Sequence, residues 1–224
     1  MKRKVYDGFD WKLIYDAHFV SDLEFPILPS NEEIIIPHGM IPFSKRKYKR
    51  ENEDFMVFYE NDEKFNQFMN YPNDYIREFK KFNGIVGPDN SMYLDSPLIV
   101  QMYNCFKNRS IEYFLRKKGF FVPFNIRFGD ERSYTTKVFP FKFAFLGVPK
   151  NDVVSVGTYG CINSTDKKRI FKEGLKEMIK ELEPKIVLVY GRMPEAIFEE
   201  FKTKTKFYRY DDYITERRKK NGNR

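Results

Sequence analysis

Residues 153–190 read VVSVGTYGCINSTDKKRIFKEGLKEMIKELEPKIVLVY, and this stretch decides the fold. Its ends, 153–157 and 186–190, are short apolar runs rich in β-branched residues, a pattern that favours buried strands. Between them, residues 166–182 carry apolar side chains at helical spacing, and Pro184 ends the helix. Two strands joined by a helix and short connections pair in parallel with a right-handed crossover. The stretch therefore predicts an α/β fold.

The same pattern extends toward the N-terminus. Residues 84–87 and 120–126 are predicted to form two further strands, and a helix over 96–118 connects them. Each of the four predicted strands ends in a cluster of small polar or charged residues. The carboxyl ends of parallel strands emerge at one edge of a sheet, where ligands bind. We therefore expect one composite site, built from clusters at 87–91 (GPDNS), 125–130 (NIRFGD), 157–163 (GTYGCIN) and 191–194 (GRMP).

The domain organisation follows from these elements. We expect a single three-layer α/β domain around a mostly parallel sheet of about four or five strands. Residues 1–50 contain four prolines and are expected to form an N-terminal extension that wraps the core and carries a basic patch. Residues 51–205 form the catalytic domain, and 206–224 form a basic C-terminal tail. Further elements are expected in the catalytic domain: a strand at 55–59, helices at 62–70 and 72–82, and a last helix from Pro194.

The charge of the chain favours a polyanionic partner. The net charge is +8 at pH 7, and 42% of the 224 residues are hydrophobic, enough for a core. Positive charge concentrates at 217–220 and at 45–50, where Tyr48 could stack on an exposed base. The alternative is that these cations are simply solvated. The partner expected is DNA, and the candidate contacts to its backbone are Lys45, Arg46, Lys47, Lys49, Arg50 and, on the 96–118 helix, Arg109.

Cysteine and histidine usage restricts the class of site. The chain has two cysteines, Cys105 and Cys161, and two histidines, which excludes a disulfide scaffold and a Cys/His zinc site of ordinary spacing. We expect no metal and no cofactor. Apolar runs long enough to span a membrane are absent from the sequence, and its start is too acidic for a secretory signal. A cytoplasmic protein is expected, with no membrane association and no obligate protein partner.

The first polar cluster carries the main chemical hypothesis. Asp89 follows Gly87-Pro88 at the end of a predicted strand, where a carboxylate could activate water or stabilise a developing cation. Its alternative role is to close a turn or cap a helix. Asn90 is a second catalytic candidate, and Ser91 and Tyr93 are candidates for substrate binding.

The second cluster places polar side chains on a buried strand. Asn125 and Arg127 alternate along the predicted strand and point to the same side, where they are costly unless paired or engaged by a ligand. Asn125 is therefore a catalytic candidate, and Arg127 a substrate-binding candidate. Asp130 is a further substrate-binding candidate, although an ordinary ion pair with Arg132 is the alternative.

The remaining clusters predict a wall of the site. Thr158 and Tyr159 lie in a glycine-spaced turn whose backbone N–H groups could face an anion or a base edge. The turn lacks the Lys-Ser/Thr pair of a P-loop. No histidine lies near Cys161 in the sequence, so the pattern favours a buried thiol over a catalytic nucleophile. Arg192, after the fourth strand, is expected to bind substrate. Arg109 could reach a phosphate or form a salt bridge to Glu112.

These clusters also carry a resemblance to a known family. The chain resembles the bacterial, phage and mobile-element proteins grouped as domain of unknown function 4417, over roughly residues 50–200. Asn90 stands where that family commonly has an aromatic residue. The resemblance implies a fold but little settled chemistry. It rests on the segments 82–93 (FNGIVGPDNSMY), 95–97 (DSP), 101–104 (QMYN), 108–109 (NR), 125–130 (NIRFGD), 160–161 (GC) and 189–191 (VYG).

A looser analogy is to the uracil-DNA glycosylase superfold. In that fold an acidic or Asn residue ends the first strand and an Asn on a central strand reads the extruded base. Here Asp89 or Asn90 would fill the first role and Asn125 the second. The analogy fails at its last motif, because neither a histidine nor a serine-rich loop follows Tyr190. It is a likeness of fold alone.

The leading functional hypothesis is a DNA glycosylase that excises a modified base, in anti-phage defence or conflict between mobile elements. The nucleotide would be flipped into the crevice, with Asp89 acting at the sugar, Asn125 pairing with the base and Tyr93 or Tyr159 stacking on it. Arg127 and Arg192 would hold phosphates. One alternative is a non-enzymatic nucleic-acid-binding replication or regulatory protein of a mobile element. Another is a metal-dependent nuclease whose carboxylates would be Asp89, Asp95 and Asp130.

Overall fold

The computed structural model describes residues 9–222, so the first eight residues of the predicted extension and the last two of the predicted tail lie outside it. Its largest sheet has four parallel strands in chain order: β6 (Phe124–Asn125), β7 (Val153–Gly157), β8 (Ile186–Tyr190) and β9 (Lys206–Tyr210). The predicted α/β fold with a mostly parallel sheet is confirmed. β9 belongs to this sheet, although its residues fall in the predicted tail.

A second parallel sheet continues the first. It contains β3 (Met40–Pro42), β4 (Phe55–Val57) and β5 (Gly84–Ile85), again in chain order. Beyond β5 the backbone N–H of Ile85 donates to the carbonyl of Phe121 at 3.0 Å, and that of Gly87 to Pro123 at 3.1 Å. These bonds join β5 to the segment leading into β6. The predicted wrapping extension therefore contributes β3, the first strand of this continuous parallel array.

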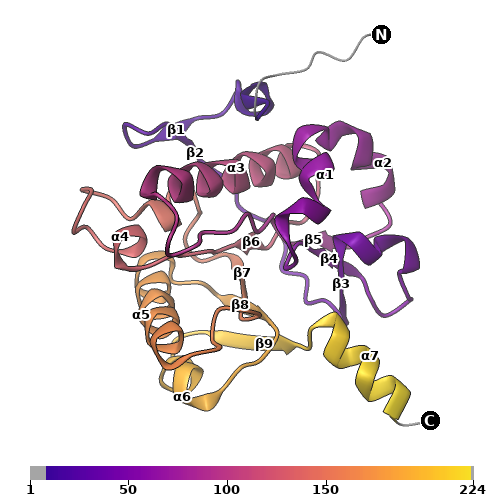
Figure 1. Cartoon of the computed structure of the whole chain (residues 1–224). Helices are drawn as coiled ribbons and strands as arrows, with labels where there is room; N and C mark the ends of the chain where they lie inside the picture. The colour runs from indigo at the N-terminus through magenta and orange to yellow at the C-terminus, as the bar shows by residue number, and fades with distance from the viewer. Residues whose placement is uncertain (1–8, 223–224) are drawn as a thin grey trace.

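The connections between strands are helical. The two long helices are α3 (Leu98–Lys117) and α5 (Thr165–Leu182), close to the predicted 96–118 and 166–182. A short antiparallel pair, β1 (Phe19–Val20) and β2 (Phe25–Pro26), packs beside α3 (Figure 1). The shorter helices are α1 (Asn66–Asn70), α2 (Ile76–Phe79), α4 (Glu131–Tyr134), α6 (Glu195–Phe198) and α7 (Tyr213–Gly222), and 3-10 turns occur at Trp11–Ile14, Phe43–Tyr48, Asp62–Lys64, Pro72–Tyr75, Phe143–Phe145 and Glu199–Phe201.

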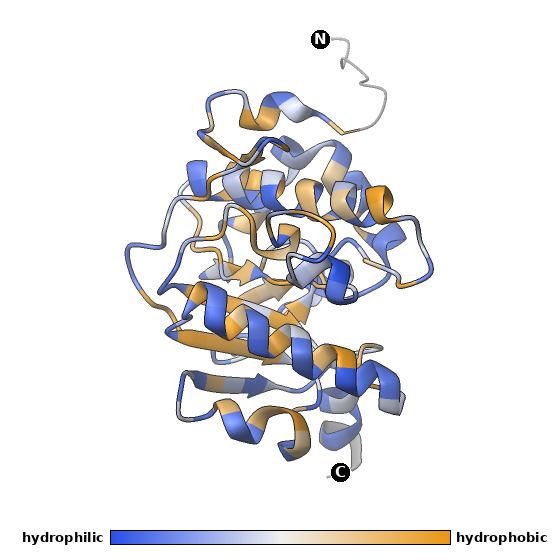
Figure 2. Ribbon diagram, turned by 90° about the vertical axis from the view of Figure 1, so that its left-hand side faces the viewer, coloured by the Kyte–Doolittle hydropathy of each residue, from blue (hydrophilic) through white to orange (hydrophobic). Residues whose placement is uncertain are grey.

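Alternation along the strands builds two separate cores. In β8, Val187 and Val189 face the helices, whereas Ile186, Leu188 and Tyr190 belong to a different cluster made only of strand and loop residues. The other strands alternate in the same way, because successive side chains of a strand point to opposite faces. Figure 2 shows the hydrophobic strands behind the amphipathic helix α5. Helices therefore cover the outer face, and the strands' own side chains fill the inner face, which refines the predicted three-layer arrangement.

The inner face is strongly curved. Tyr59, just after β4, stacks on Tyr190 of β8 with ring centroids 5.3 Å apart. In a flat sheet these strands, four positions apart, would be separated by about 19 Å. The hydroxyl of Tyr210 at the end of β9 donates to the carbonyl of Pro37, just before β3, at 2.8 Å. The array therefore curls into a barrel-like sheet whose strand carboxyl ends share one rim, the usual position of active sites in such folds.

Within residues 9–222, none of the helices combines the length and hydrophobicity needed to cross a membrane. Both cysteines are free thiols. Cys105 lies on α3 and is buried, and Cys161 follows β7 and is half-buried.

Candidate functional site

An ion pair between a buried carboxylate and a half-buried arginine occupies the carboxyl rim of the sheet. Asp89, after β5, accepts a hydrogen bond from the guanidinium of Arg127, after β6, at 3.1 Å. The side chain of Asp89 is 7% exposed and that of Arg127 is 20% exposed. Burial raises the pKa of Asp89 above its ordinary value, whereas Arg127 and the Asn125 amide act in the opposite direction. The site thus holds a desolvated carboxylate beside one cation, an arrangement suited to acid–base chemistry.

Asn125 holds this carboxylate in place. Its amide nitrogen donates to Asp89 Oδ1 at 2.9 Å and to the carbonyl of Pro88 at 2.7 Å. Its amide oxygen accepts from the hydroxyl of Tyr59 at 3.0 Å, and that hydroxyl also contacts Ser155 Oγ at 2.8 Å. The amide group is therefore committed to protein partners. Asn125 positions Asp89, and it is not placed to pair with a base as the sequence hypothesis expected.

A cavity of about 540 Å³ opens beside the ion pair, and we call it the main cavity. This volume falls in the range that small-molecule sites occupy. Asp89 and Arg127 lie on its wall with the exposed rings of Tyr93 and Tyr159, which are 61% and 62% exposed. The rest of the lining combines polar and apolar groups: Tyr59, Glu60, Asn61, Ser91, Met92, Leu94, Asp95, Ile126, Phe128, Gly129, Gly157, Gly160, Cys161, Lys167, Ile170 and Phe171.

Ser91 reaches the main cavity, but its polar groups are already engaged. Its backbone N–H and hydroxyl both donate to the carboxylate of Asp62, at 3.0 and 2.9 Å. The side chain of Asn104 in turn donates to the Ser91 carbonyl at 2.6 Å. These bonds fix the loop that presents Asp89 and Tyr93.

Asn90 faces away from the main cavity. It is 1% exposed, and its side-chain amide donates to Asn108 Oδ1 on α3 at 2.6 Å. Its backbone N–H donates to the same oxygen at 3.0 Å. The predicted catalytic role is therefore corrected: Asn90 ties the loop to α3, because a polar residue buried behind a tight turn needs a partner.

Asp130 also serves the local backbone. It caps α4 by accepting from the N–H of Arg132 at 3.0 Å and forms an ion pair with the Arg132 guanidinium at 2.8 Å. It is not among the residues lining either cavity described here, so the predicted substrate contact gives way to the ion pair that the sequence left open. Within residues 9–222, no three His, Cys, Asp or Glu side chains are grouped to hold a metal ion. The carboxylates named for a nuclease, Asp89, Asp95 and Asp130, therefore do not form such a group.

Arg109 lies in the protein interior rather than at a DNA surface. It is 1% exposed and donates to Glu112 Oε2 at 2.8 Å, to the Asn125 carbonyl at 2.9 Å and to the Ala144 carbonyl at 2.8 Å. Glu112 Oε1 accepts the Asn125 backbone N–H at 2.7 Å. The predicted phosphate contact is wrong, because burial keeps the guanidinium away from solvent. The salt bridge to Glu112 fixes β6 beneath the ion pair of Asp89.

The basic run at 45–50 divides into buried and exposed cations. Arg46 is held by Glu78 at 2.9 Å and covers the Phe43 ring at 4.0 Å, so its expected DNA contact is corrected to a structural role. Lys49 is half-buried, with its amino group 5.8 Å from the centre of the Phe82 ring. Lys45, Lys47 and Arg50 are exposed, and their contact to a DNA backbone stays a prediction.

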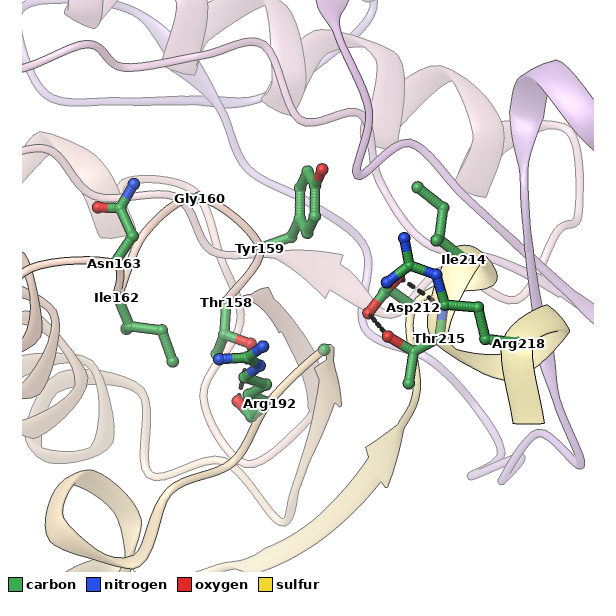
Figure 3. A pocket seen from close by; sticks show the side chains of 11 residues that line it. Thr158, Tyr159, Gly160, Ile162, Asn163, Arg192, Asp212, Ile214, Thr215 and Arg218 are labelled. Atoms are coloured by element: carbon green, nitrogen blue, oxygen red, sulfur yellow. Dashed lines mark hydrogen bonds between the residues drawn. The ribbon is translucent and has the colours of Figure 1, made fainter. Parts of the chain in front are cut away.

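Thr158 and Arg192 lie at a second, smaller cavity of about 350 Å³, which we call the side cavity (Figure 3). Thr158 is buried, and its hydroxyl donates to the Arg192 carbonyl at 2.7 Å, which joins the turns after β7 and β8. Arg192 is exposed and lines the side cavity. The structure thus separates these two residues from the ion pair of Asp89 and Arg127, while Tyr159 borders both cavities.

Sequence reasoning missed several residues of the site. Tyr59 follows the apolar run of β4, and Lys167 lies in the first turn of α5; both line the main cavity. Arg218 of α7 lines the side cavity, in a segment that was expected to be a tail. Tyr59 had a usable signal, since it stands at a strand carboxyl end like Asp89. Lys167 and Arg218 lie in charged runs that resemble solvated surface.

Comparison with known proteins places the chain in a family. It matches the family described as a domain of unknown function, DUF4417, over residues 17–211. It is 23% identical over 148 residues to the Gene 1 protein of Mycobacterium phage L5, covering 66% of this chain and 62% of that protein. The Gene 1 protein of Mycobacterium phage D29 is 22% identical over 148 residues, covering 66% of this chain and 52% of that protein.

The matched part spans less than two thirds of either curated relative, and no solved structure matches the chain. The family match includes all seven strands of the parallel array, from β3 to β9, and the rim where the ion pair lies. On this match the protein belongs to the DUF4417 family.

Proposed function

We propose that this protein is a DNA glycosylase that receives a flipped-out nucleotide in the main cavity and hydrolyses its N-glycosidic bond. The observation that carries the proposal is the ion pair of the buried Asp89 with the half-buried Arg127, on the wall of a cavity of about 540 Å³ at the strand carboxyl ends. Extrusion of a nucleotide costs a few kcal/mol of unstacking, which contacts inside the cavity must offset.

The cavity offers groups suited to each part of a nucleotide. The exposed rings of Tyr93 and Tyr159 can stack on a base, a contact that contributes about 1–3 kcal/mol per base. Lys167 and Arg127 supply positive charge on the same wall. Asn125 keeps the Asp89 carboxylate oriented toward the cavity, the role that its hydrogen bonds favour over base pairing.

Asp89 would act on the water and the sugar. Its carboxylate accepts a proton from the attacking water as the new C–O bond forms at the anomeric carbon. The N-glycosidic bond breaks, and its electron pair leaves with the base, which takes up a proton from solvent. The carboxylate also stabilises the positive charge that develops on the sugar.

DNA is the partner that the overall charge of +8 favours, and the exposed cations at 45–50 extend the positive surface. We further propose a modified base as the target, in a cytoplasmic setting of anti-phage defence or mobile-element conflict. The free thiols of Cys105 and Cys161 are compatible with a reducing compartment.

The proposal is tested by incubating the purified protein with modified and unmodified DNA. The expected result is the appearance of abasic sites in modified DNA, detected by strand cleavage after alkali treatment. Intact DNA after prolonged incubation with a panel of modified bases would contradict the assignment. If the DNA strands are instead cleaved without alkali treatment, and EDTA prevents this cleavage, the nuclease alternative is supported.

A second candidate function is non-enzymatic binding of nucleic acid. It is favoured by the exposed Lys45, Lys47 and Tyr48 on the 3-10 helix Phe43–Tyr48, which require no cavity. Neutralising Lys45 and Lys47 together separates the two functions. If that variant loses the biological effect while the Asp89 and Asn125 variants keep it, the binding function is the correct one.

The pH dependence of base excision should depend on Arg127. Base excision by the Asp89 carboxylate rises as pH increases through the pKa of this group, which burial has raised. Arg127 lowers that pKa, so Arg127→Gln is expected to raise it further and to move the acid limb of kcat/KM to higher pH. The measurement is a pH profile of base excision between about pH 4 and pH 9. The matched control is Lys180→Gln, because Lys180 is an exposed cation in the last turn of α5, at the end away from the cavity. This variant should leave the acid limb of the pH profile where it is in wild type. An unshifted or lowered limb in Arg127→Gln would contradict the role of the ion pair.

A further inference from the structure

The side cavity lies at the ends of three neighbouring strands. The turns after β7 and β8 form one side of it, and the segment from β9 into α7 forms the other (Figure 3). Its charged lining groups are Arg192, Asp212 and Arg218. It is adjacent to the main cavity, because Tyr159 and Gly160 belong to the walls of both.

Two arginines of the side cavity are available to a ligand. Arg192 and Arg218 are exposed, and within residues 9–222 neither forms an ion pair with a carboxylate. Neighbouring arginines of the same segments behave differently: Arg209 pairs with Asp211, and Arg217 approaches Glu53 at 3.6 Å. The acidic groups nearby are thus used by other cations, and the two guanidinium groups that line the cavity keep their donors. Planar guanidinium donors match phosphate oxygens well.

The carboxylate in the lining is already engaged. Asp212 caps α7, with Oδ1 accepting the Thr215 backbone N–H at 3.1 Å and Oδ2 accepting the Thr215 hydroxyl at 2.6 Å. Figure 3 shows this pair on the α7 side of the cavity, turned toward each other. Two cations against one capped anion leave the lining with a net positive charge, which favours an anionic ligand.

The turn after β7 adds backbone donors. It is closed by the Cys161 N–H donating to the Thr158 carbonyl at 3.1 Å, and Gly160 has a positive φ of 74° with open space around it. In the described part of the chain the N–H groups of Tyr159 and Gly160 have no protein acceptor. Successive free N–H groups in such a turn are a common feature of anion sites.

We propose that the side cavity binds a phosphodiester group of the DNA strand whose flipped nucleotide occupies the main cavity. The shared wall of Tyr159 and Gly160 lets one strand pass from the first cavity to the second. Arg192, Arg218 and the turn N–H groups then contact the phosphate. This inference rests on the proposed function, because it takes its ligand from the same strand.

The test measures DNA affinity rather than base excision. Arg192→Gln and Arg218→Gln are compared with wild type by fluorescence anisotropy of a labelled duplex carrying one mismatched pair, at several salt concentrations. Each substitution is expected to weaken binding about fivefold near physiological salt and to lower the salt slope by about one. Lys180→Gln removes one exposed positive charge far from the strand carboxyl ends and should change neither value. Wild-type affinity and slope in both arginine variants would overturn the proposal.

Two further arms separate the possible outcomes. Titration with inorganic phosphate and with a nucleoside monophosphate distinguishes a free phosphate ligand from the DNA backbone: either one binding more tightly than the duplex would overturn the DNA assignment. Abasic-site formation is measured on the same samples. If the arginine variants lose affinity but the wild-type protein forms no abasic sites, the phosphate site is supported and the glycosylase activity is rejected. If the wild-type protein forms abasic sites but the arginine variants bind DNA as tightly as it does, the glycosylase activity is supported and the phosphate site is rejected.

Discussion

Replacing Asp89 by Asn is expected to reduce base excision by about 10²–10⁴-fold, the range that a positioned general acid–base group contributes. The substitution keeps the shape of the side chain and removes the negative charge that would act on water and sugar. It also leaves Arg127 without its carboxylate, but the side chain of Arg127 is 20% exposed, so it is not fully buried when unpaired. Because burial already disfavours the charged form of Asp89, we expect the variant to fold.

Two comparisons make the result specific. Asp95→Asn changes a carboxylate on the same cavity wall, and a glycosylase that depends on Asp89 should retain its activity in this variant. Under the nuclease alternative both substitutions would impair cleavage. Thermal unfolding of each variant shows whether the fold is intact. Base excision by a folded Asp89→Asn at the wild-type rate would remove Asp89 from the mechanism.

The regular elements were predictable because their signal is local. The runs 153–157 and 186–190 and the helix between them depend on apolar spacing within a few residues, and the structure places β7, α5 and β8 there. The strand expected at 120–126 narrows to Phe124–Asn125: the carbonyls of Phe121 and Pro123 still accept from Ile85 and Gly87, but the N–H of Val122 donates to the Asn31 side chain instead of a strand. The sequence did not predict β9, because Lys206 and Arg209 interrupt its aromatic residues as in a charged tail, and its residues are exposed or half-buried in the structure.

The curvature of the sheet was not predictable from local patterns. The contact of Tyr59 with Tyr190 joins residues that are far apart in the chain, and it exists only because seven strands follow one another in order and curl. Strand order depends on all the crossovers together, so no single segment reveals it.

The candidate site was predictable in part. Asp89, Arg127, Tyr93 and Tyr159 meet at the main cavity, because the carboxyl ends of parallel strands share a rim. Asn90 and Asp130 instead hold a loop and cap a helix, roles that use the same residue types as a catalytic site. A sequence shows that a polar residue follows a strand but not which partner it finds.

Replacing Arg109 by Met is expected to destabilise the fold by about 3–5 kcal/mol near neutral pH, the usual cost of removing one partner from a buried ion pair. Arg109 satisfies three acceptors: Glu112, the Asn125 carbonyl and the Ala144 carbonyl. Without it Glu112 must either stay charged in the interior with no cation beside it or take up a proton, and both carbonyls lose a donor. Urea unfolding followed by circular dichroism measures the loss.

The carboxylate makes this loss dependent on pH. Burial raises the pKa of Glu112 from 4.5 to about 7, although Arg109 acts to lower it. The folded protein therefore keeps this proton at pH values where the unfolded chain has released it, so stability falls as pH rises through that window. Without Arg109 the pKa of Glu112 rises further, so the stability of the variant continues to fall at pH values above those at which the wild-type protein has released this proton. The destabilisation of Arg109→Met should accordingly be smaller near pH 5 than near pH 8.

A second substitution assigns the effect to the ion pair. In Arg109→Met/Glu112→Gln the amide oxygen of Gln can still accept the Asn125 backbone N–H that Glu112 accepts at 2.7 Å, but no charge remains buried. We expect this double variant to be more stable than Arg109→Met at pH 8 and to lose the pH dependence of the difference from wild type. A loss of stability of equal size at both pH values, unchanged by Glu112→Gln, would mean that Arg109 acts through packing and its carbonyl contacts alone.

Because Glu112 also holds Asn125, and Asn125 holds Asp89, the same variants should weaken base excision only to the extent that β6 shifts beneath the cavity.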